Sequence, residues 1–356
     1  MAVPELCDEP LRLAIRNRHL ECARLLLDAG ADPNKRYFFG AELSLVSTRD
    51  VEFMRLLLTY GARPDTRDRA GLTPLMKAAR ASDLLKRRID TKRLLLIHGY
   101  DIPDVNGTTD ERHDYRTVLH YGVLSGNHSI VTLLIKQGAR RVFPPNYRKP
   151  TPLDLAILKG IPELVRILVH AGADVNASSP IIGSPLHVAC SDSIPQRLPI
   201  LQMLLHAGAD PNIVVDTDGG PPLRPVIAEY LASNEKPCAA VLGLLLRHGA
   251  KVIMKTQFRD QLGLLNSLHN LTDHPKLFVA LTEAAECFDI CMIRRSSQLA
   301  ELQRQILLAC ARKPLSLCHQ ARLAIRHRLG TTNLTMNVKK LQIPTTLMDY
   351  LLYEIR

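Results

Sequence analysis

A short phrase returns seven times within the first 253 residues, and it constrains the fold more than any other feature of the sequence. Each copy ends a run of apolar residues with a glycine: LLLDAGADPN, LLLTYGARPD, LLLIHGYDIP, LLIKQGARRV, ILVHAGADVN, MLLHAGADPN and LLLRHGAKVI. The seven glycines are 31 to 41 residues apart, and a period of this size is typical of stacked helical repeats. A glycine after each run permits the left-handed residue that ends a helix.

A second phrase precedes each leucine run and predicts a first helix in every unit. Its copies are EPLRLAI, a shortened AELSLVS, TPLMKAA, TVLHYGV, TPLDLAI, SPLHVAC and PPLRPVI. Proline in a first turn gives up an N–H that would have no helical partner, and the preceding Thr or Ser can cap the helix. Neither helix of such a pair can bury its leucines alone, so neighbouring units must stack.

These phrases resemble the ankyrin repeat, whose signature is TPLHxA and whose period is about 33 residues. The resemblance implies an all-α solenoid of helix-turn-helix repeats with β-turn fingers, about seven repeats over residues 1–252. The longer spacings indicate insertions at LLKRRIDTK and DVNGTTDERHDYR. Residues 253–310 lose the phrase but keep helical patterning, and we interpret them as a degenerate capping repeat and a connecting helix.

Residues 311–356 contain the stretch SLCHQARLAIRHRLG, which does not repeat. Pro314 and Ser316 are helix start signals and Gly330 is a stop signal. Four small or apolar residues fall on one face of the predicted helix, and three arginines on its other face. The apolar set is Leu317, Ala321, Ala324 and Ile325, and the arginines are Arg322, Arg326 and Arg328.

The pattern Ser-Leu-x-x-x-Ala-x-x-x-Ile is similar to the elongin-binding box that opens a SOCS box. The family prefers Cys where Ala321 stands. The resemblance implies that Leu317 docks in elongin C, with elongin B accompanying it, and that 311–356 is a small helical SOCS box. The elongin-binding residues it implies are Ser316, Leu317, Ala321, Ala324 and Ile325.

Downstream, LQIPTTLMDYLLYEI resembles the family's cullin-selecting element and final helix. The resemblance implies that a cullin with its RING protein is recruited at Leu341, Ile343 and Pro344. Gln342 replaces the first of two usual prolines, which leaves the choice of cullin open. With the repeats, these motifs make the chain similar to the ankyrin-repeat and SOCS-box family.

That resemblance implies a substrate-recognition subunit of an elongin BC–cullin–RING ubiquitin ligase, itself without catalytic residues or cofactors. In the alternative, the tail merely caps the solenoid, and the protein is an ankyrin scaffold or inhibitor without a role in ubiquitination. The sequence holds no GxGxxG, Walker-type loop, HExxH or GxSxG motif. Histidines recur before the repeat glycines, where a polar helix end is expected rather than a metal site. They are His98, His170, His206 and His248.

Charge and hydropathy argue against nucleic-acid and membrane partners. Of the net charge of +11, residues 311–356 contribute +6, so +5 is spread over the other 310 residues. That density is too low to neutralise many phosphates. Apolar runs are far shorter than the ~20 residues that cross a bilayer, and MAVPELCDEP lacks the pattern of a signal peptide. We therefore expect a soluble, intracellular protein in the cytoplasm or nucleus.

Two predicted fingers are candidates for binding an unknown protein substrate. NKRYFFG places Tyr37, Phe38 and Phe39 at one tip, and RRVFPPNYRKP carries Arg140, Arg141, Phe143, Tyr147 and Arg148. Five of the chain's 16 aromatic residues lie in these two loops, and exposed aromatics beside arginines are typical of binding hot spots. Such a surface favours an acidic or phosphorylated segment. Alternatively, Phe38 and Phe39 pack against the next unit.

Overall fold

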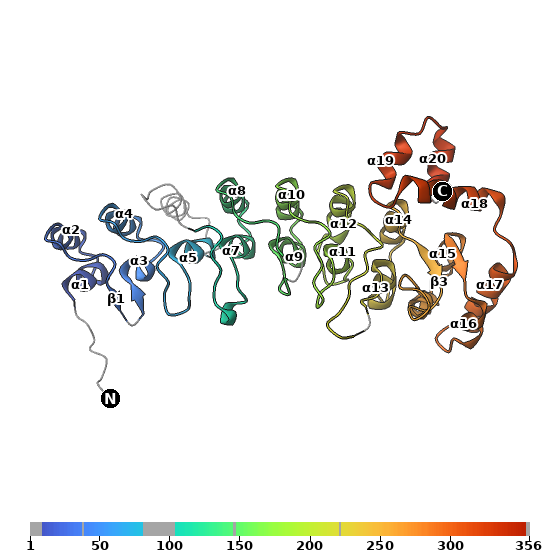
Figure 1. Ribbon diagram of the computed structural model, residues 1–356, viewed down its shortest axis with the longest axis horizontal. Helices are drawn as coiled ribbons and strands as arrows, with labels where there is room; N and C mark the ends of the chain where they lie inside the picture. The colour runs from blue at the N-terminus through green and yellow to red at the C-terminus, as the bar shows by residue number, and fades with distance from the viewer. Residues whose placement is uncertain (1–8, 38, 81–103, 145–146, 221, 354–356) are drawn as a thin grey trace. The chain divides into compact units, whose positions relative to one another are not determined.

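The computed structural model describes residues 9–37, 39–80, 104–144, 147–220 and 222–353 (Figure 1). The chain divides into two compact units, Met1–Arg141 and Val142–Arg356. Phe38, His98, the leucine run that ends at Gly99 and the expected LLKRRIDTK insertion lie outside the described residues.

The described part of the first unit contains helix pairs joined by fingers, which confirms the predicted repeat fold. In the second repeat the finger forms a two-stranded antiparallel hairpin, with Arg36 opposite Ala41 and Tyr37 opposite Gly40. The elements are α1 (Pro10–Arg16), α2 (Leu20–Asp28), β1 (Arg36–Tyr37), β2 (Gly40–Ala41), α3 (Glu42–Leu45), α4 (Val51–Thr59), α5 (Pro74–Arg80), the 3-10 helix η1 (Glu111–His113), α7 (Val118–Leu124) and α8 (His128–Lys136).

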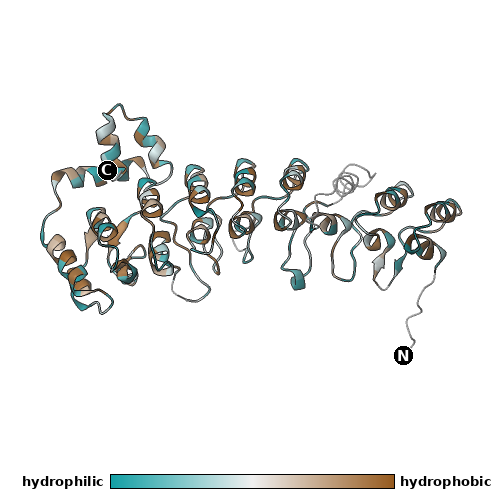
Figure 2. Ribbon diagram, turned by 180° about the vertical axis from the view of Figure 1, so that it is seen from behind, coloured by the Kyte–Doolittle hydropathy of each residue, from teal (hydrophilic) through white to brown (hydrophobic). Residues whose placement is uncertain are grey.

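The second unit continues the pairs and ends in three further helices. It contains α9 (Pro152–Leu158), α10 (Pro162–His170), α11 (Pro185–Ala189), α12 (Arg197–His206), α13 (Val226–Ser233), α14 (Ala239–Arg247), β3 (Val252–Met254), η2 (Leu265–Leu271), α15 (Pro275–Glu283), β4 (Ala285–Phe288), α16 (Ile290–Arg295), α17 (Glu301–Arg312), α18 (Leu317–Leu329), α19 (Leu334–Lys339) and α20 (Thr345–Leu351). Figure 2 shows that most of these helices carry hydrophobic and hydrophilic residues together.

Two local expectations were wrong. The phrase PPLRPVI was expected to open a helix near its first prolines, but α13 begins only at Val226, after Pro225. Three prolines in five positions remove the backbone donors that an earlier start would need. The region after residue 252 is also not purely helical, because β3 pairs with β4 in a parallel ladder.

An asparagine in the finger couples each of several repeats to the next. The Nδ2 of Asn176 donates to the carbonyl of Gly208 at 3.2 Å, and its Oδ1 accepts from the amide of Asp210 at 2.8 Å. The same pair of bonds is made by Asn34, Asn106 and Asn212. These contacts satisfy groups that the end of a helix leaves without partners, so repetition of the phrase also specifies how the units stack.

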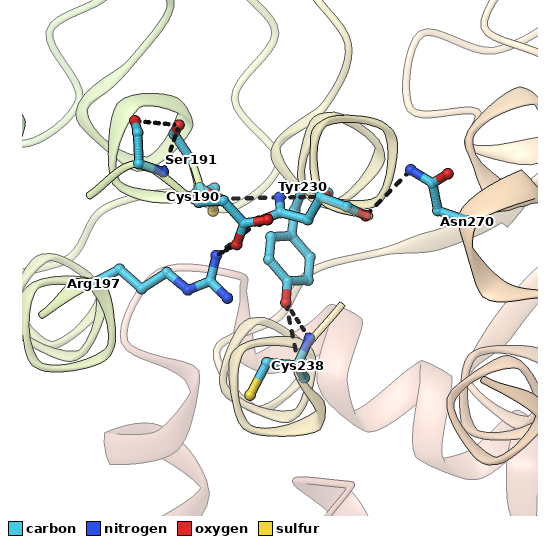
Figure 3. Close-up of polar contacts among 9 residues, drawn as sticks. Cys190, Ser191, Arg197, Tyr230, Cys238 and Asn270 are labelled. Carbon is cyan, nitrogen blue, oxygen red and sulfur yellow. Dashed lines mark hydrogen bonds and ion pairs between the residues drawn. The ribbon is translucent and has the colours of Figure 1, made fainter. Parts of the chain in front are cut away.

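A buried polar network holds the last repeats together (Figure 3). The fully buried Asn234 donates to the carbonyls of Cys190 and Tyr230, and its Oδ1 accepts from Arg197 at 2.7 Å. Asn270 of η2 adds donors to the carbonyls of Leu231, Ala232 and Asn234. The network therefore joins α11, α12, α13 and η2.

Candidate binding site on the C-terminal helix

Helix α18 begins and ends where its sequence signals predict. Ser316 is the cap, and its Oγ accepts a hydrogen bond from the backbone N–H of His319 at 3.2 Å. At the other end Gly330 has a φ of +80°, a left-handed value that disfavours other residues. The helix therefore presents its side chains in the register expected from the sequence.

The apolar face of α18 points away from the rest of its unit. Leu317 is 84% exposed and Ile325 is 40% exposed. Ala321 and Ala324, which lie between them on the same face, are exposed as well. Monomeric proteins expose single apolar residues freely, but a leucine and an isoleucine flanking two alanines form a patch that another helix can approach closely.

The opposite face of α18 is held by an arginine whose role the sequence did not suggest. Of the residues of α18, all of which the structure describes, only Arg326 is buried. Its guanidinium donates to the carbonyl of Leu351 in α20 and to that of Leu246 in α14, both at 2.6 Å. Burial lowers the pKa of this arginine. Arg326 therefore ties α18 to the last helix and to the last repeat at once.

Two tyrosines extend this attachment. The guanidinium of Arg322 lies 3.4 Å from the ring centre of Tyr350 and 4.4 Å from that of Tyr353. Arg326 lies 4.7 Å from the ring centre of Tyr353. Such cation–π contacts stabilise by ~0.5–2 kcal/mol each, depending on how far they are shielded from water. The basic face predicted for this helix thus includes two arginines that make internal contacts.

The connection between α18 and α19 packs closely against the repeats. A Cβ added to Gly249, which ends α14, would come within 3.1 Å of the Cα and carbonyl oxygen of Thr331. His319 adds a contact between its Nε2 and the carbonyl of Ala285 in β4 at 3.2 Å. The glycine that ends the last repeat therefore also provides the space in which the C-terminal helices dock.

The residues predicted to select a cullin lie beside a small core. Leu334, Val338, Leu351 and Leu352 are its buried members, and Leu341 and Ile343 pack against it while remaining partly exposed. Gln342 and Pro344 are exposed. Leu341 and Ile343 thus help to shape this segment, and Gln342 and Pro344 form its outer surface.

The first predicted finger packs largely onto its own unit. The hydroxyl of Tyr37 donates to Glu9 at 2.7 Å, and Arg12 lies 4.7 Å from the centre of its ring. Burial and the bond to Glu9 raise the pKa of Tyr37. Phe39 is 49% exposed. Of these two aromatic residues, Phe39 is the one with the larger accessible surface.

The residues of the other predicted finger fall in both units. Arg140 and Arg141, at the end of the first unit, are exposed. In the second unit the rings of Phe143 and Tyr147 are 4.7 Å apart, and Arg148 pairs with Asp218 at 3.1 Å. Sequence reasoning missed Phe258, which is 97% exposed in the loop after β3. A phenylalanine beside Arg259 in a turn was the available signal.

Histidines occupy structural positions in the repeats. His120 and His187 complete capping boxes with Thr117 and Ser184. The rings of His206 and His248 are 5.1 Å apart, closer than the spacing of stacked helices suggests. In the described ranges no three His, Cys, Asp or Glu residues are grouped as a metal site would need. The same ranges contain no helix with the length and apolarity to cross a bilayer.

Comparison with known families agrees with this architecture. Residues 313–352 match the SOCS box model. Residues 90–179 match a model of three ankyrin repeats, and residues 9–37 and 184–216 match the single ankyrin repeat. The molecule is therefore an ankyrin-repeat protein with a SOCS box behind its repeats.

Similar proteins combine the same two modules. Human "Ankyrin repeat and SOCS box protein 6" is 43% identical over 132 residues, which cover 36% of this chain and 30% of that protein. "Ankyrin repeat and SOCS box protein 5" of Oryctolagus cuniculus is 28% identical over 204 residues, covering 57% and 49%. The matches thus span less than half of each relative. This chain therefore shares both of its modules with proteins named for ankyrin repeats and a SOCS box.

Among solved structures, the ankyrin repeat domain of Bcl-3 is similar to part of the chain. It is 25% identical, covers 58% of this chain and 89% of that domain, and superimposes with a TM-score of 0.48.

Proposed function

We propose that this protein is the substrate-recognition subunit of an elongin BC–cullin–RING ubiquitin ligase. The observation that carries the proposal is the exposed leucine-led face of α18 inside a SOCS box. Burying a leucine contributes ~1.5–3 kcal/mol. Leu317 enters a pocket of elongin C, elongin B accompanies it, and Ala321 and Ala324 let the partner's backbone come close. Ile325 closes the far end of the contact.

The cullin contact in this proposal uses the segment after α19. Pro344, beside the exposed Gln342, faces the cullin, while Leu341 and Ile343 keep the segment in shape through the core beneath it. The ubiquitin chemistry belongs to the cullin's RING protein and its partner enzyme. The repeats bind the client, and the two bonds of Arg326 keep α18 fixed to the end of the repeats.

Capture of purified elongin B–C by the full chain tests the proposal. Leu317→Ala is expected to weaken binding about tenfold to a hundredfold, because ~1.5–3 kcal/mol of leucine burial is lost and each 1.4 kcal/mol is about tenfold. Leu317→Asp is expected to abolish capture, because a carboxylate would be buried without a partner. Isothermal titration or surface plasmon resonance gives the affinities.

Leu25→Asp is the matched control, since Leu25 is 67% exposed on α2 of the first unit. It should leave capture unchanged, and neither variant should lower the unfolding temperature. Full capture by Leu317→Asp would remove the ligase assignment and favour a scaffold role for the repeats.

A further inference from the structure

A cavity of about 370 Å³ opens between the first two fingers of the first unit. One wall is segment 34–36, which leads into β1, and the other is segment 63–67 of the next finger, and the structure describes every residue of both segments. The volume is within the roughly 300–1,000 Å³ of ligand pockets, and a charged side chain of a bound protein fits in it. The lining residues are Asn34, Arg36, Arg63, Asp65, Thr66 and Arg67.

Arg63 stands where three other fingers have an aspartate. Asp32, Asp174 and Asp210 each lie two residues after the glycine of their repeat, as Arg63 does. Each of the three carboxylates accepts a hydrogen bond from the backbone amide two residues further on, at 2.8 to 2.9 Å, and so closes its own finger. A guanidinium has no acceptor and cannot make this bond. The second finger therefore lacks a local hydrogen bond and presents an arginine in its place.

The guanidinium groups of Arg36 and Arg63 have no internal partner. Both residues are exposed, and among the described residues neither side chain forms a hydrogen bond or an ion pair. Other arginines of this unit are engaged, as Arg18 is with Asp50 at 3.0 Å. Arg36 and Arg63 can therefore bind an anion without giving up a contact within the chain.

The backbone on both sides of the cavity is fixed, although these two side chains are free. The Nδ2 of Asn34 donates to the carbonyl of Gly61 at 2.8 Å, and its Oδ1 accepts from the amide of Arg63 at 2.7 Å. Arg36 lies in β1, opposite Ala41 of β2. Binding therefore needs the ordering of side chains only, which lowers its entropic cost.

The third arginine of the cavity is oriented by the fold. The Nη1 of Arg67 donates to the carbonyl of Thr108 at 2.7 Å and to that of Gly71 at 3.2 Å. These neutral acceptors leave its charge in place, and a guanidinium has five N–H donors, so some remain for a ligand. The one lining carboxylate, Asp65, accepts from the amide of Asp104 at 3.0 Å. The lining therefore carries three positive charges against one negative charge.

We propose that this cavity is a subsite for an anionic side chain of the client protein, a carboxylate or a phosphorylated serine, bound by Arg36, Arg63 and Arg67. Arginine binds the paired oxygens of carboxylate and phosphate with its fork of N–H groups, and arginine clusters recognise acidic and phosphorylated segments. Calling the ligand a client rests on the proposed function, whereas the anion site does not use the elongin contact. The three arginines were not among the substrate-binding residues expected from the sequence.

Binding of peptide pools to the full chain tests the subsite. Each biotinylated pool has one fixed central residue, phosphoserine, glutamate, serine or lysine, between random flanks. The wild-type protein should bind the phosphoserine pool, the glutamate pool or both at least fivefold more than the serine pool, and the lysine pool least. Stronger binding of phosphoserine than of glutamate identifies a phosphorylated client segment. A glutamate pool that binds as well or better identifies an acidic one.

Arg63→Asp should abolish this preference. It introduces the residue that three other fingers have at this position, so the variant should fold as the wild type does, which circular dichroism checks. Arg63→Lys should keep part of the preference, because lysine keeps the charge but not the fork. Arg55→Asp is the matched control, since Arg55 is exposed on α4 of the same unit and does not line the cavity. It should leave the preference unchanged.

Equal binding of all four pools, a preference for lysine, or a preference that survives in Arg63→Asp would overturn the proposal. An equal loss in Arg55→Asp would overturn it as well, because the preference would then come from the net charge of the unit. So would tighter binding of random single-stranded DNA than of either anionic pool. Leu317→Asp should leave the preference unchanged, and Arg63→Asp should leave elongin B–C capture unchanged. Failure of the elongin contact and failure of this subsite are therefore separate results.

Discussion

Two helices of the same unit place their apolar residues in opposite ways. In α10, a repeat helix, Leu164, Val165 and Leu168 are fully buried. In α18, Leu317 is 84% exposed and the buried residue is Arg326. A repeat helix is covered by neighbours in its own chain, so its apolar face contributes to folding. α18 is attached through Arg326 and through Leu329 at its C-terminal end, which leaves the face of Leu317 exposed.

Replacing Leu164 and Leu317 separately with alanine tests whether the two helices differ in this way. The loss of stability in Leu164→Ala should be larger than that in any other variant proposed below. Leu164→Ala should lower the free energy of unfolding by ~2–5 kcal/mol, because it leaves a cavity in a packed core. Leu317→Ala should change it by less than ~0.5 kcal/mol, as exposed substitutions usually do. Urea unfolding followed by circular dichroism measures both.

Comparable destabilisation by the two variants would mean that the apolar face of α18 is part of the chain's own core. Elongin capture adds the reciprocal control, since Leu164→Ala should bind normally at temperatures where it is folded.

Replacing Arg326 should destabilise the C-terminal helices and leave the repeat helices unaffected. Arg326→Met keeps most of the side-chain volume but leaves the carbonyls of Leu351 and Leu246 without their donor. Two hydrogen bonds from a charged group are lost, at ~1.5–3 kcal/mol each before water replaces them. We expect a net loss of about 2–3 kcal/mol, confined to the C-terminal helices.

Hydrogen exchange locates this loss. The amide of Val338 in α19 should exchange ~30-fold to 150-fold faster, since each 1.4 kcal/mol is about tenfold. That of Leu168 in α10 should keep its rate. Arg328→Met is the matched control, because Arg328 is exposed on the same helix. Equal protection of Val338 in wild type and Arg326→Met would show that the arginine is not the anchor.

Much of the fold was predictable because the repeat phrase contains the local signals that start and end a helix. Helix pairs follow from a capping Ser or Thr, a first-turn Pro and a closing Gly, and α9, α11 and α18 begin where those signals stand. Where prolines crowd, as before Val226, the same signals misplace the start. The β3–β4 ladder was not predicted, because its two strands are about 33 residues apart in the chain and no hairpin turn connects them.

The candidate sites were predictable where a pattern on one helix was enough. The face of Leu317 and Ile325 needed only helical periodicity. The role of Arg326 depends on a carbonyl 80 residues earlier, which no local pattern contains. Arg63 could have been noticed as an Arg where DAGADPN and HAGADVN have Asp. That its guanidinium has no partner among the described residues, however, becomes visible only in the structure.

Asp154 extends the comparison from apolar residues to a buried polar group. The expected effect on the unfolding free energy is the smallest of those proposed here. The pKa of Asp154 is raised to about 6, with burial as the main cause. A raised carboxyl pKa contributes stability that is present below the unfolded value of about 3.9 and is lost as pH rises through about 6. Wild type should therefore lose on the order of 2 kcal/mol relative to Asp154→Asn between pH 4 and pH 7. Because both proteins share all other titrating groups, the difference between their urea unfolding free energies isolates this carboxyl. A difference that stayed constant across that range would mean that the pKa of Asp154 in the folded protein is close to its unfolded value, and that burial does not raise it.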